Sequence, residues 1–324
     1  MFRTQVDISP LNKPIALSDS ICLIGSCFVQ TMGEKFQQNK FRTYSNPFGT
    51  LYNPASIFRL LHDAINQSMP GEHTYLVNQG VHLNYQFHSD FSSSSESDLQ
   101  AQIEQAFIST RSFLKNCSWL VITLGSAYCF ELQENSQIVS NCHKMPARLF
   151  QRRLLDPDEI VMRFEQLYRA IEALNPELNY IFTVSPVRHL RDTLVQNSVS
   201  KAVLRVATNS IKEAHPDTIR YFPSYELMMD DLRDYRFYQA DMLHPTEVAK
   251  DYIWQKLTDS YFSQETQDFL KTWEPLQKAL HHRAFHPRSE AHQQFLRKVI
   301  TQLKKLTDKV DVHSEIEELE QQLI

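Results

Sequence analysis

The sequence predicts an α/β fold, in which a parallel sheet is covered by helices on both faces, followed by a helical extension. Three continuous apolar runs, at residues 22–25, 119–125 and 180–184, are typical of strands buried on both faces. Segments with helical spacing of apolar residues lie between these runs. Because strands that alternate with helices are joined by right-handed crossovers, the sheet is expected to be parallel and to lie between two helical layers.

Composition excludes several classes of protein. The 324 residues include 33 Lys and Arg against 38 Asp and Glu, a net charge of −5, which argues against a nucleic-acid partner. The five cysteines are scattered without a C-x-x-C pair, so neither a metal site nor a disulfide framework is predicted. No apolar run reaches the roughly 18 residues of a membrane span, and no signal segment is recognised. We therefore expect a cytoplasmic protein without a cofactor.

The first strand ends at Gly25-Ser26, after a proline-containing lead-in over residues 1–20. A helix is predicted to follow to about residue 40, because apolar side chains recur every four residues at Phe28, Met32 and Phe36. Gly25 permits a sharp turn, and Ser26 would lie at the positive amino end of the helix, where negative charge is stabilised. An acyl-transfer nucleophile needs this position; a plain helix cap is the alternative for Ser26.

A short second strand is predicted at 41–44, and a Pro/Gly turn at 46–49 follows it. The helix after this turn is expected to begin at Asn53-Pro54. The segment 71–95 interleaves histidines, aromatics and serines, and it is interpreted as an insertion with a pair of strands at 75–87. Such a loop could cover the mouth of an active site.

The middle of the chain continues the alternation of helices and strands. Helices are predicted at 97–116, 157–174 and 200–214, and the last strand at 219–222. The segment 146–156 is interpreted as a basic connection, with arginines at 148, 152 and 153. These arginines could bind an anionic substrate, but a solvated helix face is the interpretation that we favour.

A carboxylate precedes a histidine by three residues in Asp241-Met242-Leu243-His244-Pro245. Pro245 suits the first turn of a helix and keeps His244 extended at the junction. Asp241 is close enough along the chain to hold the imidazole in one tautomer. This pattern predicts a general base far downstream of Ser26.

Residues 263–324 contain no glycine, and their apolar residues have helical spacing. Two or three helices are predicted there, with packing or self-association as their role. The chain is therefore divided into a domain at 1–262 and a helical extension at 263–324.

The string Gly25-Ser26-Cys27-Phe28-Val29 resembles the signature of the GSCFA family, with valine in place of the final alanine. Further segments resemble that family, at 46–54, 123–127, 141–144, 185–189 and 234–244. The resemblance spans roughly residues 1 to 260, the length of a large domain. GSCFA proteins are similar to the SGNH (GDSL-like) hydrolases. This resemblance implies a three-layer α/β/α sandwich with a flavodoxin-like sheet and a serine hydrolase or acyltransferase activity.

The catalytic residues that the resemblance implies are Ser26 as nucleophile, His244 as base and Asp241 as its orienting carboxylate. The backbone N–H groups of Ser26 and Gly49 are the expected oxyanion donors, although Gly49 also fits a plain turn. Ser126 stands near the position where the superfamily carries the asparagine of a G-x-N motif, which this chain lacks. Asn141 is the candidate that could replace that asparagine.

Four residues are candidates for substrate binding: His88, His143, Arg188 and His189. His143 is also a second candidate base, ranked below His244 because no aspartate precedes it. Cys27 is a rival nucleophile, and its side chain is expected to point toward the helix interior.

The resemblance implies a carboxylic ester as substrate, and an acylated carbohydrate is one such compound. A non-catalytic ligand-binding module on the same fold is the first alternative, because fold does not fix function. The second alternative is an assembly protein that forms a homo-oligomer through its C-terminal helices.

Overall fold

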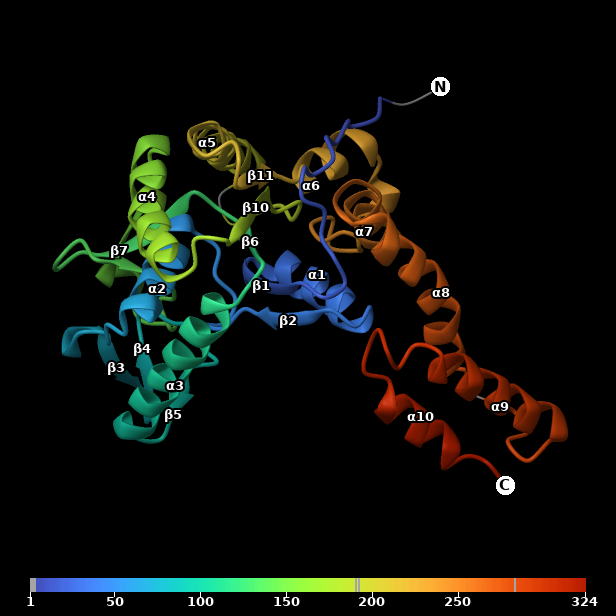
Figure 1. Ribbon diagram of the computed structural model, residues 1–324. Helices are drawn as coiled ribbons and strands as arrows, with labels where there is room; N and C mark the ends of the chain where they lie inside the picture. The colour runs from blue at the N-terminus through green and yellow to red at the C-terminus, as the bar shows by residue number, and fades with distance from the viewer. Residues whose placement is uncertain (1–3, 190, 192, 283) are drawn as a thin grey trace.

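The computed structural model describes residues 4–189, 191, 193–282 and 284–324 (Figure 1). Its central sheet has five strands in the order β11-β10-β6-β1-β2, and every neighbouring pair is parallel. This is the flavodoxin-like order, so the predicted fold class is confirmed. The strands are β1 (Ser20–Gly25), β2 (Arg42–Ser45), β6 (Trp119–Leu124), β10 (Asn179–Val184) and β11 (Ile219–Tyr221).

Alternate residues of each strand pack against different helical layers, because successive side chains point to opposite faces of a sheet. Cys22 and Ile24 belong to one core, shared with α2 (Pro54–Asn66), α3 (Glu96–Lys115), α4 (Pro157–Leu174) and α5 (Thr193–Ala214). Ile21 and Leu23 belong to the other core, shared with α1 (Cys27–Gln38) and α7 (Glu247–Tyr261). The sheet is thus enclosed on both faces, as its continuous apolar runs predicted (Figure 1).

Two small antiparallel sheets lie beside the main one. The first contains β3 (Tyr75–Asn78), β4 (Val81–Asn84) and β5 (Ser92–Ser93), so the insertion holds one strand more than expected. The second contains β7 (Tyr128–Leu132), β8 (Ile138–Val139) and β9 (Phe150–Leu154). Short single turns complete the connections: η1 (Glu72–Thr74), η2 (Ala147–Leu149), α6 (Ser224–Glu226), η3 (Leu227–Asp231) and η4 (Tyr235–Phe237).

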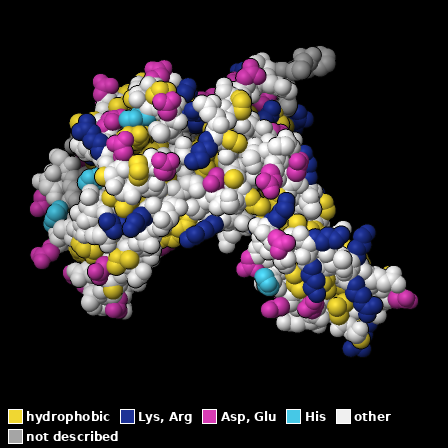
Figure 2. Space-filling model, in the orientation of Figure 1, with side chains coloured by type: hydrophobic (Ala, Val, Ile, Leu, Met, Phe, Trp, Pro, Cys, Tyr) yellow, Lys and Arg dark blue, Asp and Glu magenta, His cyan; other side chains and the backbone are white. Residues whose placement is uncertain are grey.

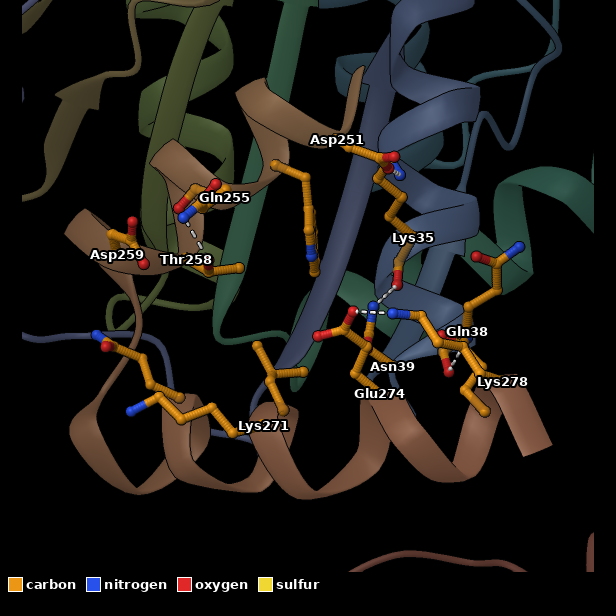
Figure 3. Close-up of a pocket in the computed structure, with 14 residues that line it drawn as sticks. Lys35, Gln38, Asn39, Asp251, Gln255, Thr258, Asp259, Lys271, Glu274 and Lys278 are labelled. Carbon is orange, nitrogen blue, oxygen red and sulfur yellow. Dashed lines mark hydrogen bonds and ion pairs between the residues drawn. The ribbon is translucent and has the colours of Figure 1, made fainter. Parts of the chain in front are cut away.

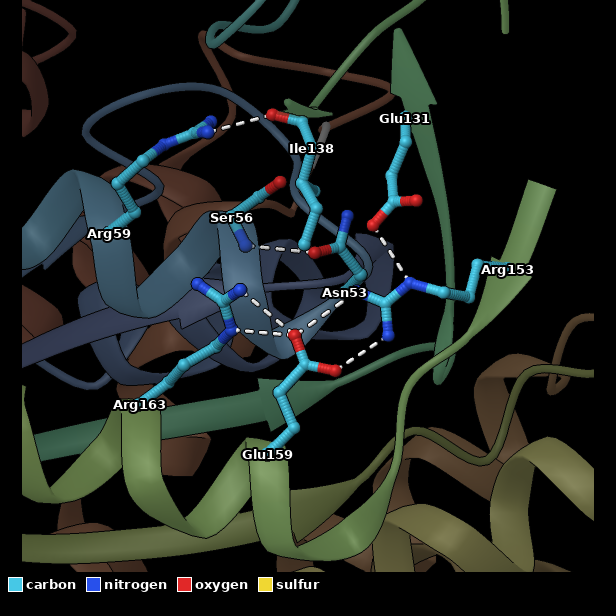
Figure 4. A network of polar contacts seen from close by, with 8 residues as sticks. All are labelled: Asn53, Ser56, Arg59, Glu131, Ile138, Arg153, Glu159 and Arg163. Carbon is cyan, nitrogen blue, oxygen red and sulfur yellow. Dashed lines mark hydrogen bonds and ion pairs between the residues drawn. The ribbon is translucent and has the colours of Figure 1, made fainter. Parts of the chain in front are cut away.

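The expectation of a plain basic connection at 146–156 is wrong, because β9 occupies part of it. The Arg152 guanidinium lies 3.5 Å from the centre of the Tyr128 ring. Arg153 pairs with Glu131 of β7 and Glu159 of α4 (Figure 4). The arginines therefore fix an edge strand to two neighbours, and the partners on β7 are more than twenty residues away in the sequence.

Three helices form the C-terminal extension: α8 (Gln264–Leu280), α9 (Glu290–Lys304) and α10 (His313–Glu320). They share an apolar core of their own, centred on side chains such as Trp273, Leu296 and Leu303. Figures 1 and 2 show this extension projecting from the body that contains the sheet. Among the described residues, no helix is both long and apolar enough to cross a bilayer.

Candidate active site

The carboxyl ends of β1 and β6 approach each other closely, and this contact fixes the start of α1. Gly25 has φ of 139°, and a Cβ at this position would lie 2.0 Å from the carbonyl oxygen of Thr123. Only glycine fits so close to a neighbouring backbone. The N–H of Ser26 then donates to that same oxygen over 3.2 Å. The chain leaves the sheet at a defined angle, and Ser26 and Cys27 are placed at its edge.

Asp241 and His244 form the hydrogen-bonded pair that their spacing predicted. The distance between Asp241 Oδ2 and His244 Nδ1 is 2.6 Å. Asp241 Oδ1 accepts the backbone N–H groups of Leu243 (2.8 Å) and His244 (3.0 Å). Met242, with φ of 60°, turns the chain back between them. Hydrogen bonds from the His244 backbone and ring, then from Leu243, lower the pKa of Asp241 to about 2, so this carboxylate is ionised at neutral pH.

The second ring nitrogen of His244 faces α1. His244 Nε2 lies 3.9 Å from Cys27 Sγ, and the imidazole is partly exposed to solvent. The expectation that the Cys27 side chain points toward the helix interior is wrong. Cys27 shares a helix face with Gln30 and Thr31, neither of which is buried, whereas the buried stripe of α1 begins at Phe28.

Ser26 has a different environment from its neighbour. Its side chain is 1% exposed, and its Oγ is enclosed without a hydrogen bond to any described residue. The alternative role of a helix cap is not seen, because the hydroxyl makes no capping hydrogen bond. A Cβ added to Gly125 would lie 3.2 Å from Ser26 Cβ, so the side chain is packed against the end of β6. The assignment of Ser26 as nucleophile stays a prediction.

Lys201 of α5 is buried below this edge, with 1% of its surface exposed. Its Nζ donates to the carbonyl oxygens of Gly125 and Ser185, both over 2.8 Å, and so bridges the ends of β6 and β10. Burial lowers the pKa of Lys201 to about 7, and the charge of a Cys27 thiolate acts in the opposite direction.

Sequence reasoning missed Lys201, although a signal was present. The inward face of α5 is occupied by residues at helical spacing: Asn197, Ser200, Lys201, Leu204, Ala207, Thr208 and Ile211. A lysine in phase with Leu204 and Ile211 is directed toward the sheet rather than toward solvent. The helix begins at Thr193, seven residues before its predicted start at residue 200.

Two predicted substrate-binding residues lie beside the same strand ends. His189 Nε2 is 2.7 Å from the carbonyl oxygen of Gly125, which therefore interacts with both His189 and Lys201. The His189 ring also meets the Tyr52 ring edge-on at 6.3 Å. The Arg188 guanidinium lies 4.2 Å from the centre of the Tyr238 ring.

The N–H groups named as oxyanion donors are engaged with backbone carbonyls. That of Ser26 donates to Thr123, that of Gly49 to Asn46 over 2.9 Å, and that of Ser126 to Tyr52 over 2.9 Å. The Ser126 hydroxyl accepts the N–H of Tyr128. The roles of these residues at an oxyanion stay predictions. By contrast, the N–H groups of Phe28 and Cys27, at the start of α1, act on the Cys27 sulfur: burial raises the pKa of this thiol, and these N–H groups offset part of the rise.

The remaining site candidates belong to the small sheets. Asn141 Oδ1 accepts the N–H of His143, whose buried ring lies 2.8 Å from the carbonyl oxygen of Asn84. Burial lowers the pKa of His143. His88 pairs with Asp90 and packs against Gly49, where an added Cβ would lie 2.3 Å from His88 Cβ. In the described part of the chain, none of these side chains hydrogen-bonds to His244, and their roles toward a substrate stay predictions.

A cavity of the described structure lies away from these residues. Its volume is about 650 Å³, and it lies between α1, α7 and α8. Figure 3 shows charged and polar side chains around it, including Lys35, Asp251 and Glu274. Gln38 also lines this cavity, at the opposite end of α1 from Cys27 and about 16 Å away at 1.5 Å per residue. The candidate site is therefore identified by its side chains and not by cavity size.

Charged side chains near α4 are satisfied within the protein. Arg153 and Arg163 both pair with Glu159, and Asn53 caps α2 by accepting the N–H of Ser56 (Figure 4). Across residues 4–189, 191, 193–282 and 284–324, no three His, Cys, Asp or Glu side chains are grouped so that they could hold a metal ion.

Comparison with known proteins identifies the family. The GSCFA family model matches residues 20–257, and the model of the GSCFA domain protein, C-terminal domain, matches residues 273–324. No curated protein matches the chain. A solved structure described as a "putative platelet activating factor" from Streptococcus pneumonia is similar, with 9% identity, a TM-score of 0.40, and 76% of this chain and 86% of that chain covered.

A second solved structure, the acetyl xylan esterase Est2A from Butyrivibrio proteoclasticus, is 12% identical with a TM-score of 0.35. The similarity covers 76% of this chain and 64% of that chain. Since the family model spans most of the sheet-containing body and the signature lies at the start of α1, the chain belongs to the GSCFA family.

Proposed function

We propose that this protein is an acyl-transfer enzyme, an ester hydrolase or O-acyltransferase, in which Asp241 and His244 form the base. The observation that carries the proposal is the 2.6 Å contact between Asp241 Oδ2 and His244 Nδ1, with the opposite nitrogen directed at the first turn of α1. A carboxylate that fixes the imidazole leaves Nε2 available to take a proton from a nucleophile. The resemblance to SGNH hydrolases supports the same reaction class.

In the proposed reaction, a nucleophile at the start of α1 transfers its proton to His244 Nε2 and attacks the ester carbonyl carbon. Asp241 stabilises the imidazolium, since hydrogen bonds hold the pKa of this carboxyl at about 2. The tetrahedral oxyanion would form beside the amino end of α1, where N–H groups favour negative charge. Its collapse expels the alcohol, which takes the proton from His244.

A second substrate then resolves the acyl-enzyme. Water gives hydrolysis, and a hydroxyl group of an acceptor gives acyl transfer. An acylated carbohydrate is the substrate class that we propose. The choice of nucleophile is between Ser26, from the signature, and Cys27, from its contact with His244.

A non-catalytic ligand-binding role is the competing proposal. It is favoured by the backbone N–H groups of Ser26, Gly49 and Ser126, all of which donate to carbonyl oxygens within the protein. A site prepared for an oxyanion would hold such donors ready for the substrate.

The two proposals are separated by the substitutions His244→Ala and Asp241→Asn, measured with p-nitrophenyl acetate and acetylated oligosaccharides. The acyl-transfer proposal expects turnover to fall by about a thousandfold or more in each variant. His62→Ala is the control, because His62 is exposed on α2. Retained turnover in His244→Ala with an intact circular dichroism spectrum contradicts the proposal. Absence of wild-type turnover on every ester favours the binding role.

A further inference from the structure

We propose that the attacking group at this site is the sulfur of Cys27, and that the buried ammonium of Lys201 stabilises its thiolate. The inference rests on the proposed acyl-transfer function and names the residue that carries the acyl group. It makes the enzyme a thiol-dependent one with a thioester intermediate, in place of the serine enzyme that the family signature suggests.

The two candidate side chains have different surroundings. Cys27 Sγ is 3.9 Å from His244 Nε2, within the reach of a sulfur hydrogen bond, and the side chain is only half-buried. Ser26 is 1% exposed, and its enclosed Oγ makes no hydrogen bond to the described residues. Ser26 is the extended residue before α1 and Cys27 is the first residue of the helix, so their side chains leave the backbone in different directions. The Cys27 thiol is therefore the group that contacts His244 and is also accessible to solvent.

The placement of Lys201 supports the same assignment. A buried ammonium is costly unless its charge is compensated, and no described carboxylate lies within ion-pair distance of its Nζ. Two carbonyl oxygens, of Gly125 and Ser185, hold it at the strand ends beside the start of α1. An anion that forms at Cys27 during the reaction would supply the missing charge.

Charged groups from several elements act on the Cys27 thiol. Burial is the largest effect and raises its pKa, while Lys201 of α5 and Lys250 of α7 lower it. Tyr52, whose own pKa is raised by burial and then by the Cys27 charge, faces the same space. The resting group is therefore a neutral thiol, and His244 must remove its proton as the reaction proceeds.

The step balances without a further reactant. The S–H proton moves to His244 Nε2 as the S–C bond forms, and the proton returns to the alkoxide as the ester C–O bond breaks. Water or an acceptor hydroxyl, deprotonated by His244, then attacks the thioester and releases Cys27. Lys201 touches neither substrate atom, so it is a positioning residue that acts through the sulfur.

Activity of the two adjacent variants tests the nucleophile. Cys27→Ala should lower turnover of p-nitrophenyl acetate by about a thousandfold or more, a larger loss than that caused by Ser26→Ala. Iodoacetamide should abolish turnover and label Cys27 by mass spectrometry. If Ser26→Ala has no turnover and the wild-type enzyme keeps its turnover after Cys27 is alkylated, this inference is overturned while the acyl-transfer proposal stands. If His244→Ala also keeps its activity, both this inference and the acyl-transfer proposal are overturned.

Alkylation kinetics test Lys201 without any ester substrate. The rate of Cys27 alkylation is measured between pH 6 and 10 in the wild type and in Lys201→Met and Lys201→Gln. Both variants should react about tenfold more slowly at pH 6.5, where Lys201 of the wild type is mostly charged, and should shift the profile to higher pH, because the stabilising charge is gone. Cys142, which is also half-buried, is the internal control for folding. Profiles identical to wild type, in either variant with unchanged Cys142 labelling, overturn the role of Lys201.

Discussion

The two ends of helix α1 have different chemistry. At its amino end, Cys27 faces His244, and Lys201 has no carboxylate partner among the described residues: its Nζ donates to two carbonyl oxygens and lies 5.8 Å from the centre of the Tyr225 ring. At its carboxyl end, charges are paired, as Lys35 is with Asp251. The cavity of about 650 Å³ lies at the paired end, where α8 packs (Figure 3).

The difference follows from the polarity of the helix. The carboxyl end of α1 presents carbonyl oxygens, and that of Gln38 accepts the indole N–H of Trp273 over 2.8 Å. Lys40, just beyond this end, pairs with Glu315 of the extension. The amino end presents N–H groups to the Cys27 sulfur instead. Ion pairs between charged side chains indicate a structural joint, and a buried lysine without a carboxylate partner beside a histidine and a thiol indicates the reactive end.

The largest expected effect separates the two ends by activity. His244→Ala should lower kcat/KM for an ester by about a thousandfold or more, since the base is lost. Lys35→Ala should leave kcat/KM within about twofold, because an ion pair at a structural joint does not touch the substrate. Steady-state kinetics of both variants measure this contrast. An equal loss of kcat/KM in the two variants would contradict the proposed difference between the two ends of α1.

The next effect concerns stability at the carboxyl end. Trp273→Ala removes a side chain that is 2% exposed and joins α8 to α1, so it should lower the free energy of unfolding by about 3–5 kcal/mol. Urea unfolding measures the change. The ester kinetics of the folded variant should match wild type, and a fall in kcat under native conditions would connect the joint to the site.

Lys201 gives a smaller effect that depends on pH. In the unfolded chain Lys201 has the ordinary pKa of a lysine, whereas burial in the folded protein lowers its pKa to about 7. The unfolded state binds more protons between these values, so the free energy of unfolding should rise with pH from about 7 toward 10. Lys201→Met should flatten this rise, as thermal unfolding across the range would show. An unchanged slope would mean that the folded lysine keeps its charge.

The smallest effect is expected for the Lys40–Glu315 pair, which is partly exposed. Glu315→Gln should cost about 1 kcal/mol or less of unfolding free energy, and high salt should reduce the difference. Differential scanning fluorimetry at low and high salt measures it. A loss as large as that of Trp273→Ala would show that charge, and not apolar packing, holds the extension.

Self-association through α8–α10, a boundary after residue 262 and a cytoplasmic location stay predictions. Deleting residues 263–324 and measuring the mass in solution would test the first of them.

Local sequence patterns determined the elements of this protein. The continuous apolar runs at 119–125 and 180–184 became β6 and β10, Asn53-Pro54 began α2, and the D-x-x-H spacing brought Asp241 onto His244. In each case, the residues that set the structure are near neighbours in the chain. Their hydrogen bonds and burial therefore follow from periodicity and backbone preference alone.

Tertiary structure decided which side chains meet. Whether Ser26 or Cys27 faces His244, why β9 carries arginines, and where Lys201 is buried all depend on elements brought together by the strand order. At the start of a helix two adjacent side chains point in different directions, and the sequence does not determine which of them is buried and which faces the histidine. That choice is made by packing against β6 and by the loop that delivers His244, because both come from far along the chain.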